Sequence, residues 1–372
     1  MRVLITGGLG FIGITLAKLL VELDYEVTLL DSLTVQVHGE IPAFEAPAGV
    51  KCVRMDVREL ADRPEVLEGM DVVYHLAAET GTAQSMYRVV HYVDVNEVGT
   101  AALIEGIGKC VRRPKHVVLA SSRSVYGEGA YVHESSPGIL VVPQSRTKEQ
   151  LVAGEWEPVD GQGRVLTCVP TPENLGFFPG SIYAASKAAQ ELLLQAASTA
   201  LGFRLSIFRF QNVYGEGQSL QNPYTGIISI FFNRAAQGIE IPIYEDGRES
   251  RDFVHVSDIV WGLVNVVKAD LPSATVMNLG AGQPTSVLSL VDDLLAATGC
   301  NVPVRVTGQF RLGDIRHCYA DTTRAKTLLG YSPQVSLREG LRRFAAWASS
   351  QPRHDDKLEK ATEELRKKGL AV

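Results

Sequence analysis

RVLITGGLGFIG, residues 2–13, places a G-x-G-x-x-G pattern directly after a short apolar run. Gly8, Gly10 and Gly13 fill the pattern, and Phe11–Leu23 continues with apolar residues at every third or fourth position. A strand, a glycine turn and a helix in this order let backbone N–H groups approach a pyrophosphate at the positive end of the helix. The stretch therefore predicts a phosphate-binding turn at the start of an α/β fold.

Further short β-branched runs alternate with helix-period segments in the first third of the chain. The predicted strands are Arg2–Thr6, Glu26–Asp31, Lys51–Asp56, Val72–Ala77 and His116–Ser121. Buried strands that alternate with crossover helices indicate a parallel sheet with helices on both faces. We expect a doubly wound, Rossmann-type α/β fold, with a smaller α/β substrate-binding lobe and a small inserted lobe.

The chain is expected to divide at changes of sequence pattern. Residues 131–180 interleave Pro, Gly and Glu without a sustained period, which favours an inserted lobe of short strands and turns. We expect a dinucleotide-binding domain from 1–210 that carries this insertion and regains 251–281. The substrate-binding lobe is expected from 211–250 and 282–352. The tail, 353–372, predicts a charged helix with only Leu358, Ala361, Leu365 and Leu370 to bury, so we interpret it as solvated with a weak partner face.

Composition excludes several classes of protein. The 372 residues carry a net charge of −6, so a basic surface for nucleic acid is not expected. No apolar run reaches the roughly 18 residues of a membrane span, and the N-terminus lacks a signal-peptide pattern. Five scattered cysteines fit neither a disulfide framework nor metal spacing. We expect a cytoplasmic protein that binds no metal, membrane or nucleic acid.

Polar and small residues at the predicted strand ends indicate NAD as the cofactor. Asp31 ends the second strand, where its carboxylate can accept hydrogen bonds from a ribose and would repel a 2′-phosphate, which favours NAD over NADP. Asp56 could contact the adenine or cap a helix, and both readings stay open. The predicted cofactor contacts are Gly7, Gly10, Phe11, Ile12, Gly13, Asp31, Ser32, Asp56, Val57, Leu76, Ala77, Ala78, Asn96, Ser121, Tyr183 and Lys187.

Three residues form a candidate proton-transfer group. Tyr183 and Lys187 stand four residues apart on one face of a predicted helix, Ile182–Leu201. A phenol has an unperturbed pKa near 10, so proton abstraction near neutral pH requires positive charge beside it. Lys187 and an oxidised nicotinamide would supply that charge. Ser122, at the end of the fifth strand, offers a hydroxyl to share the substrate's proton.

The motifs TGGLGFIG, HLAA, SSRSVYG and YAASK together resemble the extended short-chain dehydrogenase/reductases, in their nucleotide-sugar epimerase/dehydratase branch. The similarity runs from Met1 to about Ser350. It implies a sugar nucleotide that is oxidised at C4 by hydride transfer to NAD, turns as a 4-keto sugar, and takes the hydride back on its other face. In that reaction Tyr183 is the base, Lys187 orients the nicotinamide ribose, and Ser122 assists at the sugar hydroxyl.

The resemblance also implies substrate contacts. Asn212 matches the residue that approaches the diphosphate, Arg251 and Arg311 match two diphosphate arginines, and Tyr244 is a candidate to stack on the base. If the sugar carries a carboxylate, Arg123 could pair with it; otherwise we expect a salt bridge to the insertion. His75 and His255 are expected to be core histidines. The predicted substrate contacts are Glu79, Thr80, Thr82, Arg123, Asn212, Tyr224, Tyr244, Arg251 and Arg311.

The residues after Ser122 narrow the reaction. A 4,6-dehydratase of this branch carries Asp-Glu there and a uronate decarboxylase carries Glu at 124, whereas this chain has Arg123-Ser124. C4 epimerisation remains, and stretches such as HLAAETGT (75–82) and SSRSVYGEG (121–129) most resemble the 4-epimerases of dTDP-L-rhamnose. The insertion lacks the cysteine pair that relatives often carry, which argues against zinc.

Alternatives stay open at this point. The substrate is expected to be a dTDP- or UDP-hexose such as dTDP-L-rhamnose, with UDP-glucuronate or UDP-hexose 4-epimerisation and net C4 oxidoreduction as enzyme alternatives. An NAD-bound sensor or scaffold is the non-enzyme alternative. Val93–Val111 and Tyr183–Leu201 resemble the helices that pair into a four-helix dimer bundle in this superfamily, so the resemblance implies a homodimer, and the Ala- and Leu-rich faces of these helices allow it.

Overall fold

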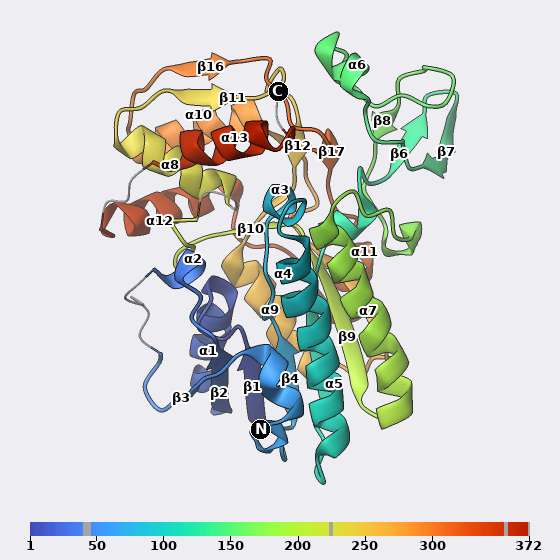
Figure 1. The fold of residues 1–372 in the computed structure, drawn as a ribbon, viewed down its shortest axis with the longest axis vertical. Helices are drawn as coiled ribbons and strands as arrows, with labels where there is room; N and C mark the ends of the chain where they lie inside the picture. The colour runs from blue at the N-terminus through green and yellow to red at the C-terminus, as the bar shows by residue number, and fades with distance from the viewer. Residues whose placement is uncertain (40–45, 223–225, 353–355, 371–372) are drawn as a thin grey trace.

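The centre of the molecule is a seven-stranded parallel sheet in the order β14-β9-β5-β4-β1-β2-β3 (Figure 1). The computed structural model describes residues 1–39, 46–222, 226–352 and 356–370. In chain order the strands are β1 (Arg2–Thr6), β2 (Glu26–Asp31), β3 (Lys51–Arg54), β4 (Val72–His75), β5 (His116–Ser122), β9 (Arg204–Phe210) and β14 (Thr275–Leu279). The strand order reverses beside β1, and ligands bind at the carboxyl edge of such sheets at this point. The predicted doubly wound α/β fold is confirmed.

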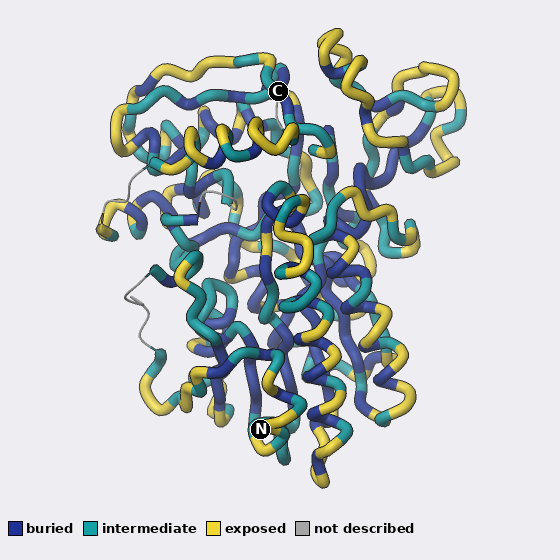
Figure 2. The backbone as a smooth tube through the Cα atoms, in the orientation of Figure 1, coloured by how far each residue is buried: buried dark blue, intermediate teal, exposed yellow. Residues whose placement is uncertain are grey.

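Helices cover both faces of the sheet because its strands are apolar on both sides. One face packs against α1 (Phe11–Glu22), α9 (Val256–Lys268) and α11 (Thr323–Leu329), and the other against α5 (Gly99–Lys109) and α7 (Ile182–Leu201). Leu4 and Ile5, neighbours on β1, point into these two different cores and are both fully buried. Figure 2 shows the buried strands between helices whose outer surfaces are exposed.

Short helices lie in the connections between the strands. They are α2 (Val35–His38), η1 (Val57–Ala61), η2 (Pro64–Val66), α3 (Thr82–Ser85), α4 (Val89–Val93), the π-helical η3 (Asp94–Val98), η4 (Arg123–Tyr126) and η5 (Glu173–Leu175). None of the helices in the described ranges is both long and apolar enough to cross a membrane.

A second core lies beyond the carboxyl edge of the sheet. It is formed by α8 (Ile227–Ala236), α10 (Val287–Thr298) and α12 (Leu337–Ser349) together with β11 (Ile241–Ile243). The same lobe contains β10 (Asn212–Tyr214), β12 (Ser250–Arg251), β13 (Phe253–His255), β15 (Thr285–Ser286), β16 (Val304–Val306), β17 (His317–Cys318) and the C-terminal α13 (Leu358–Lys367). Since this core shares no residue with the two sheet cores, we propose two domains close to the predicted division, except that α11, which lies in the range predicted for the substrate-binding lobe, packs on the sheet through Ala325.

Residues 131–180 include a three-stranded sheet of their own. Its order is β7-β6-β8, and β6 (Tyr131–His133) pairs antiparallel with both β7 (Ser136–Val141) and β8 (Thr167–Cys168). The insertion also contains α6 (Lys148–Val152), a helix that the sequence pattern does not predict. In Figure 1 the insertion stands beside the second lobe, above the sheet.

Candidate active site

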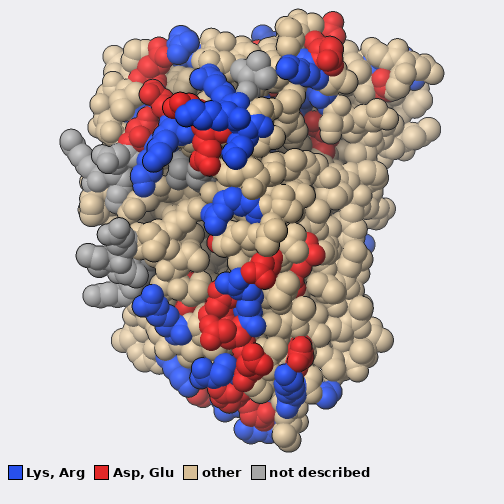
Figure 3. All heavy atoms as spheres, in the orientation of Figure 1, with Lys and Arg blue, Asp and Glu red and all other residues tan. Residues whose placement is uncertain are grey.

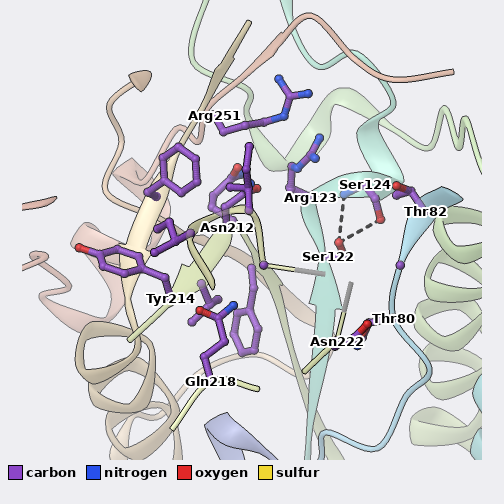
Figure 4. A pocket seen from close by; sticks show the side chains of 18 of the residues that line it. Thr80, Thr82, Ser122, Arg123, Ser124, Asn212, Tyr214, Gln218, Asn222 and Arg251 are labelled. Carbon is purple, nitrogen blue, oxygen red and sulfur yellow. Dashed lines mark hydrogen bonds between the residues drawn. The ribbon is translucent and has the colours of Figure 1, made fainter. Parts of the chain in front are cut away.

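A cavity of about 590 Å³ lies between the carboxyl edge of the sheet and the second lobe. We call its sheet side the cofactor-side wall, formed by the Gly7–Gly13 turn and by Ser122, Tyr183 and Lys187. Its other side is the substrate-side wall, formed by Asn212, Tyr244, Arg251, Arg311 and Asp314 together with Leu358. Figure 4 shows side chains from both walls directed into one space.

The glycine turn has room only for glycine at its tightest points. Gly7 has a φ of 66°, and a Cβ there would lie 2.8 Å from the Ala77 backbone nitrogen. A Cβ on Gly13 would lie 2.6 Å from the Gly8 carbonyl oxygen. Gly10 caps α1 without a side chain, so the first N–H groups of the helix keep their hydrogen-bonding capacity. This cradle fits a pyrophosphate, and with it the dinucleotide that the sequence predicts.

Asp31 is held against the glycine turn. Its carboxylate accepts hydrogen bonds from the backbone nitrogens of Leu33 at 2.8 Å and Leu9 at 3.1 Å, and the His38 ring nitrogen lies 3.5 Å away. Phe11, Ile12, Leu76 and Ala78 line the cavity, whereas Asp31, Ser32 and Ala77 lie behind its lining. A ribose contact by Asp31 stays a prediction.

Asp56 and Val57, both predicted cofactor contacts, have structural roles in this fold. Strand β3 ends at Arg54, before Asp56, because Asp56 caps η1 and accepts a hydrogen bond from the Arg58 backbone at 3.0 Å. Hydrogen bonds from the Arg58 guanidinium lower the pKa of the Asp56 carboxyl. Val57 is buried against Gly99. Neither residue lines the cavity, so the helix-cap reading of Asp56 describes the structure.

Asn96 and Glu79 are not among the residues that line the cavity, and the contacts predicted for them stay predictions. Asn96 is fully buried. Its side-chain oxygen accepts a hydrogen bond from Glu79 N, and its side-chain nitrogen donates to Glu79 O and, at 2.9 Å, to Ser186 Oγ. The Glu79 carboxylate lies 3.1 Å from His91 Nε2. These contacts fix the π-helical η3 against α7. Thr80 and Thr82, by contrast, line the cavity.

The proton-transfer group meets at one point of the cofactor-side wall. Ser122 ends β5 and caps η4, where its Oγ accepts hydrogen bonds from Ser124 N at 3.2 Å and Ser124 Oγ at 2.9 Å (Figure 4). The adjacent Ser121 donates its hydroxyl proton to Glu191 and also lines the cavity. Tyr183 is the second residue of α7, whose N-cap is Ser181. Burial raises the pKa of Tyr183, and a hydrogen bond with Ser122 and the charge of Arg123 oppose that rise.

Lys187 is buried and forms a hydrogen bond within its own helix. Its ammonium donates to Gln190 Oε1 at 2.6 Å, and burial lowers the pKa of Lys187 to about 7. The charge of Arg123 favours ionisation of Tyr183, and a contribution of Lys187 to this charge stays a prediction. Gln190 in turn donates to Thr100 at 2.7 Å, so the lysine ends a buried polar network.

His75 belongs to the same network and behaves as a core residue. Its two ring nitrogens lie 2.8 Å from Thr6 Oγ1 and 2.9 Å from Thr100 Oγ1, and burial lowers the pKa of His75 to about 3. His255 caps α9 and lies 2.9 Å from Glu216. Neither histidine lines the cavity.

The substrate-side wall is cationic at its centre. Arg251 donates to the carbonyl oxygens of Ser250, Ile315 and Arg316 at 2.7–3.0 Å, which leaves its Nε and one Nη2 proton for a ligand. Arg311 bonds Asp314 at 2.7 Å and lies over the Tyr244 ring, 5.3 Å from its centroid. Asn212 lines the cavity from β10. Tyr224 lies outside the described residues.

Arg123 extends into the same part of the cavity as Arg251 (Figure 4). Within the described ranges its side chain forms neither a hydrogen bond nor an ion pair, so the predicted alternative of a salt bridge to the insertion is not found there. A guanidinium without a protein partner, beside Ser122 and Arg251, is suited to an anionic or oxygen-rich group of a ligand.

Sequence reasoning missed three acidic residues that line the cavity, Glu245, Glu249 and Asp314. Asp314 follows Arg311 by three residues, and that spacing was the available signal. Glu249 carries no local pattern; it is nearly buried, and burial raises the pKa of its carboxyl to about 7. Asp314 and Glu249 line the cavity beside the arginines.

The comparison with known families agrees with this geometry. The model described as "NAD dependent epimerase/dehydratase family" matches residues 3–149 and 163–280, which is most of the chain. The chain belongs to this family. Its NAD dependence agrees with the glycine cradle, and the predicted family, enzyme class and cofactor are confirmed.

Individual relatives extend over nearly the whole length. The dTDP-L-rhamnose 4-epimerase of Burkholderia thailandensis is 36% identical, over 94% of this chain and 95% of that protein. The UDP-glucose 4-epimerase of Thermotoga maritima, solved with UDP-glucose, has a TM-score of 0.75 at 27% identity and covers 94% of this chain and 99% of its own. MoeE5, solved with UDP-glucuronic acid and NAD, has a TM-score of 0.74 at 28% identity, with the same coverage of both chains.

Proposed function

We propose that the chain is an NAD-dependent nucleotide-sugar 4-epimerase that inverts C4 through a 4-keto intermediate. The proposal rests on one cavity that brings together a glycine cradle, the Ser122–Tyr183 pair, and the two arginines Arg251 and Arg311. The Burkholderia and Thermotoga relatives, which are 4-epimerases of a dTDP-linked and a UDP-linked sugar, support it.

The chain's own side chains account for the proton transfer. The Tyr183 phenolate accepts the proton of the C4 hydroxyl, and the Ser122 hydroxyl, oriented by its cap bonds to Ser124, binds the same sugar oxygen. The positive charge of Arg123 favours the phenolate. Bound NAD supplies the acceptor for the C4 hydride. Arg251 and Arg311 bind the diphosphate, which holds the sugar in reach while it turns.

The substrate that the sequence favours is a dTDP- or UDP-hexose such as dTDP-L-rhamnose. The 36% identity to the Burkholderia enzyme supports the dTDP sugar. The unpaired Arg123 supports the alternative of a uronate such as UDP-glucuronate, because a carboxylate would pair with its guanidinium. Dehydration lacks the Asp-Glu pair after Ser122, since Arg123 and Ser124 occupy those positions.

A substrate panel tests the proposal. Purified protein is incubated with dTDP-L-rhamnose, UDP-glucose and UDP-glucuronate, and C4 configuration is followed by NMR. We expect inversion on at least one of them without added NAD being consumed. Stoichiometric release of NADH would instead identify a C4 oxidoreductase, and no change on any sugar would contradict the proposal and favour the sensor or scaffold.

We also propose a cytoplasmic homodimer that serves carbohydrate biosynthesis. Helices α5 and α7 lie side by side (Figure 1), and their surface exposes Leu192 and Leu193 on α7 and Val98 just before α5. Apolar side chains on adjacent helices favour a four-helix interface between two copies. Replacing Leu192 and Leu193 by Glu should yield a monomer by light scattering, and a monomeric parent protein would contradict this part.

A further inference from the structure

The C-terminal helix α13 is seated on the second lobe although its sequence is strongly charged. Ala361 and Leu365, four residues apart, are each only 5% exposed, while Lys360, Glu363 and the end of the helix face solvent. Figure 3 shows basic and acidic side chains intermixed on this upper part of the molecule. Two apolar residues at positions i and i+4 form one apolar stripe on a short helix, and in α13 this stripe packs against the second lobe.

Contacts on three sides fix the segment around α13. Asp356, just before the helix, binds the Arg234 guanidinium of α8, which is almost fully buried. The carbonyl of Leu370, after the helix, accepts a hydrogen bond from Leu312 N at 3.2 Å. Lys368 Nζ lies 5.8 Å from the centroid of the Tyr87 ring, which follows α3 on the sheet side of the cavity. The segment therefore spans from the second lobe toward the sheet domain.

The helix also touches the residues of the substrate-side wall. Leu358, in its first turn, lines the cavity together with Tyr244 and Arg311. One turn later, Thr362 Oγ1 lies 3.1 Å from the Tyr244 hydroxyl. The Arg311 guanidinium lies over the Tyr244 ring. Thr362 is therefore connected to Arg311, a predicted diphosphate contact, through the side chain of Tyr244.

We propose that α13 is part of the substrate-binding site and forms the wall of its nucleoside end. Leu358 presents apolar surface to the nucleoside of a nucleoside-diphosphate sugar, and Thr362 is a positioning residue that fixes Tyr244 beneath Arg311. The inference rests on the proposed function, because it needs a nucleotide to occupy this end of the cavity. A tail that only stabilised the lobe would change thermal stability and leave nucleotide affinity unaltered.

Calorimetric titration of the full-length protein with UDP and with dTDP tests this role. Leu358→Ser removes the apolar wall, and Leu365→Asp unseats the helix from outside the cavity. We expect each variant to weaken binding of the preferred nucleotide about fivefold to tenfold, as for the loss of one well-buried apolar contact. Lys360→Gln, on the exposed face of the same helix, should bind like the parent. Bound NAD, measured after denaturation, should be equal in all four proteins and shows that the fold is retained.

The outcomes separate the two proposals. Binding of neither UDP nor dTDP to the parent protein would overturn the proposed function, and this inference with it. Binding by Leu358→Ser and Leu365→Asp with the parent's affinity would overturn the inference alone. If Leu365→Asp loses NAD, Leu358→Ser still decides, because it changes only a side chain at the cavity surface.

Discussion

The cofactor-side wall of the cavity is built from short pieces of sequence, whereas the substrate-side wall joins widely separated segments through buried charges. Gly7, Gly10 and Gly13 occupy one strand–turn–helix unit, and their spacing follows from local backbone geometry. On the other side Arg316, fully buried, binds Glu157 of the insertion together with Glu245 and Asp246 at 2.7–3.0 Å. A wall of the first kind is encoded locally, and a wall of the second kind depends on tertiary ion pairs.

The largest effect is expected from Tyr183→Phe. The change removes the proton acceptor of the cofactor-side wall but no backbone contact, so C4 inversion should slow by roughly 10²- to 10⁴-fold while bound NAD is retained. Turnover by NMR and NAD content by absorbance measure the two effects.

Tyr244→Phe is the matched variant on the substrate-side wall. It removes a phenolic hydroxyl that contacts Thr362 and no reacting atom, so KM should rise with little change in kcat.

A Tyr183→Phe protein that turns over within tenfold of the parent would contradict the assignment of the base.

The next effect concerns stability of the substrate-side wall. Arg316→Met removes the buried cation that Glu245, Glu157 and Asp246 share. Because Glu157 and Asp246 are partly exposed and Glu245 keeps its pair with Arg146, the change should cost about 1–3 kcal/mol of unfolding free energy. Urea unfolding followed by tryptophan fluorescence measures this loss. Arg164→Met, which breaks the exposed pair with Asp160 in the same insertion, is the control and should change stability little. Equal losses in both variants would show that the buried cluster does not hold this wall together.

Gly13→Ala probes the local wall with the smallest possible addition. The new Cβ would lie 2.6 Å from the Gly8 carbonyl and 2.7 Å from that of Gly7, so the turn must open. Overpacking of this kind costs about 1–3 kcal/mol, which corresponds to roughly 5- to 150-fold weaker NAD binding if the strain falls on the cradle. Gly161→Ala, where nothing lies within 4 Å, is the control. Unchanged NAD affinity in Gly13→Ala would mean that the turn has more freedom than the contacts indicate.

The contrast between the walls explains what the sequence could predict. The glycine spacing and the Tyr183–Lys187 pair are patterns within a few residues of one another, and residues of both line the cavity at the sheet edge. The fold followed because five β-branched runs alternate with helices, a pattern that a parallel sheet requires.

The remaining features depend on contacts between distant residues. Arg123 acts on Tyr183, which is 60 residues away in the sequence, and Arg316 binds Glu157 over a separation of 159 residues, so neither interaction has a local signature. The tail was interpreted as a solvated helix because its charges dominate its composition, yet two small apolar positions suffice to seat it. Asp56 shows the opposite case, where a strand-end carboxylate had two readings and only the cap geometry distinguished them.

The smallest expected effect is a pH dependence carried by Glu249. Its carboxyl lines the cavity beside Arg251, and burial raises its pKa to about 7. Raising the pH through 7 therefore adds a negative charge next to the diphosphate site, and the Kd of UDP-glucose should increase a few-fold between about pH 6 and pH 8. UDP-glucose is the suitable ligand because its diphosphate diester does not titrate in that range.

Glu249→Gln should remove this pH dependence, whereas Glu155→Gln, on the exposed surface of the insertion, should keep it.

The pH dependence of folding stability gives a second measurement with a defined sign. A carboxyl whose folded-state pKa lies above its ordinary 4.5 binds more protons in the folded than in the unfolded protein between pH 4.5 and 7, so stability falls as pH rises through that window. Glu249→Gln should then raise the melting temperature more at pH 8 than at pH 5. Equal effects at both pH values would place the titration of Glu249 outside this window and remove it from the substrate-side wall's electrostatics.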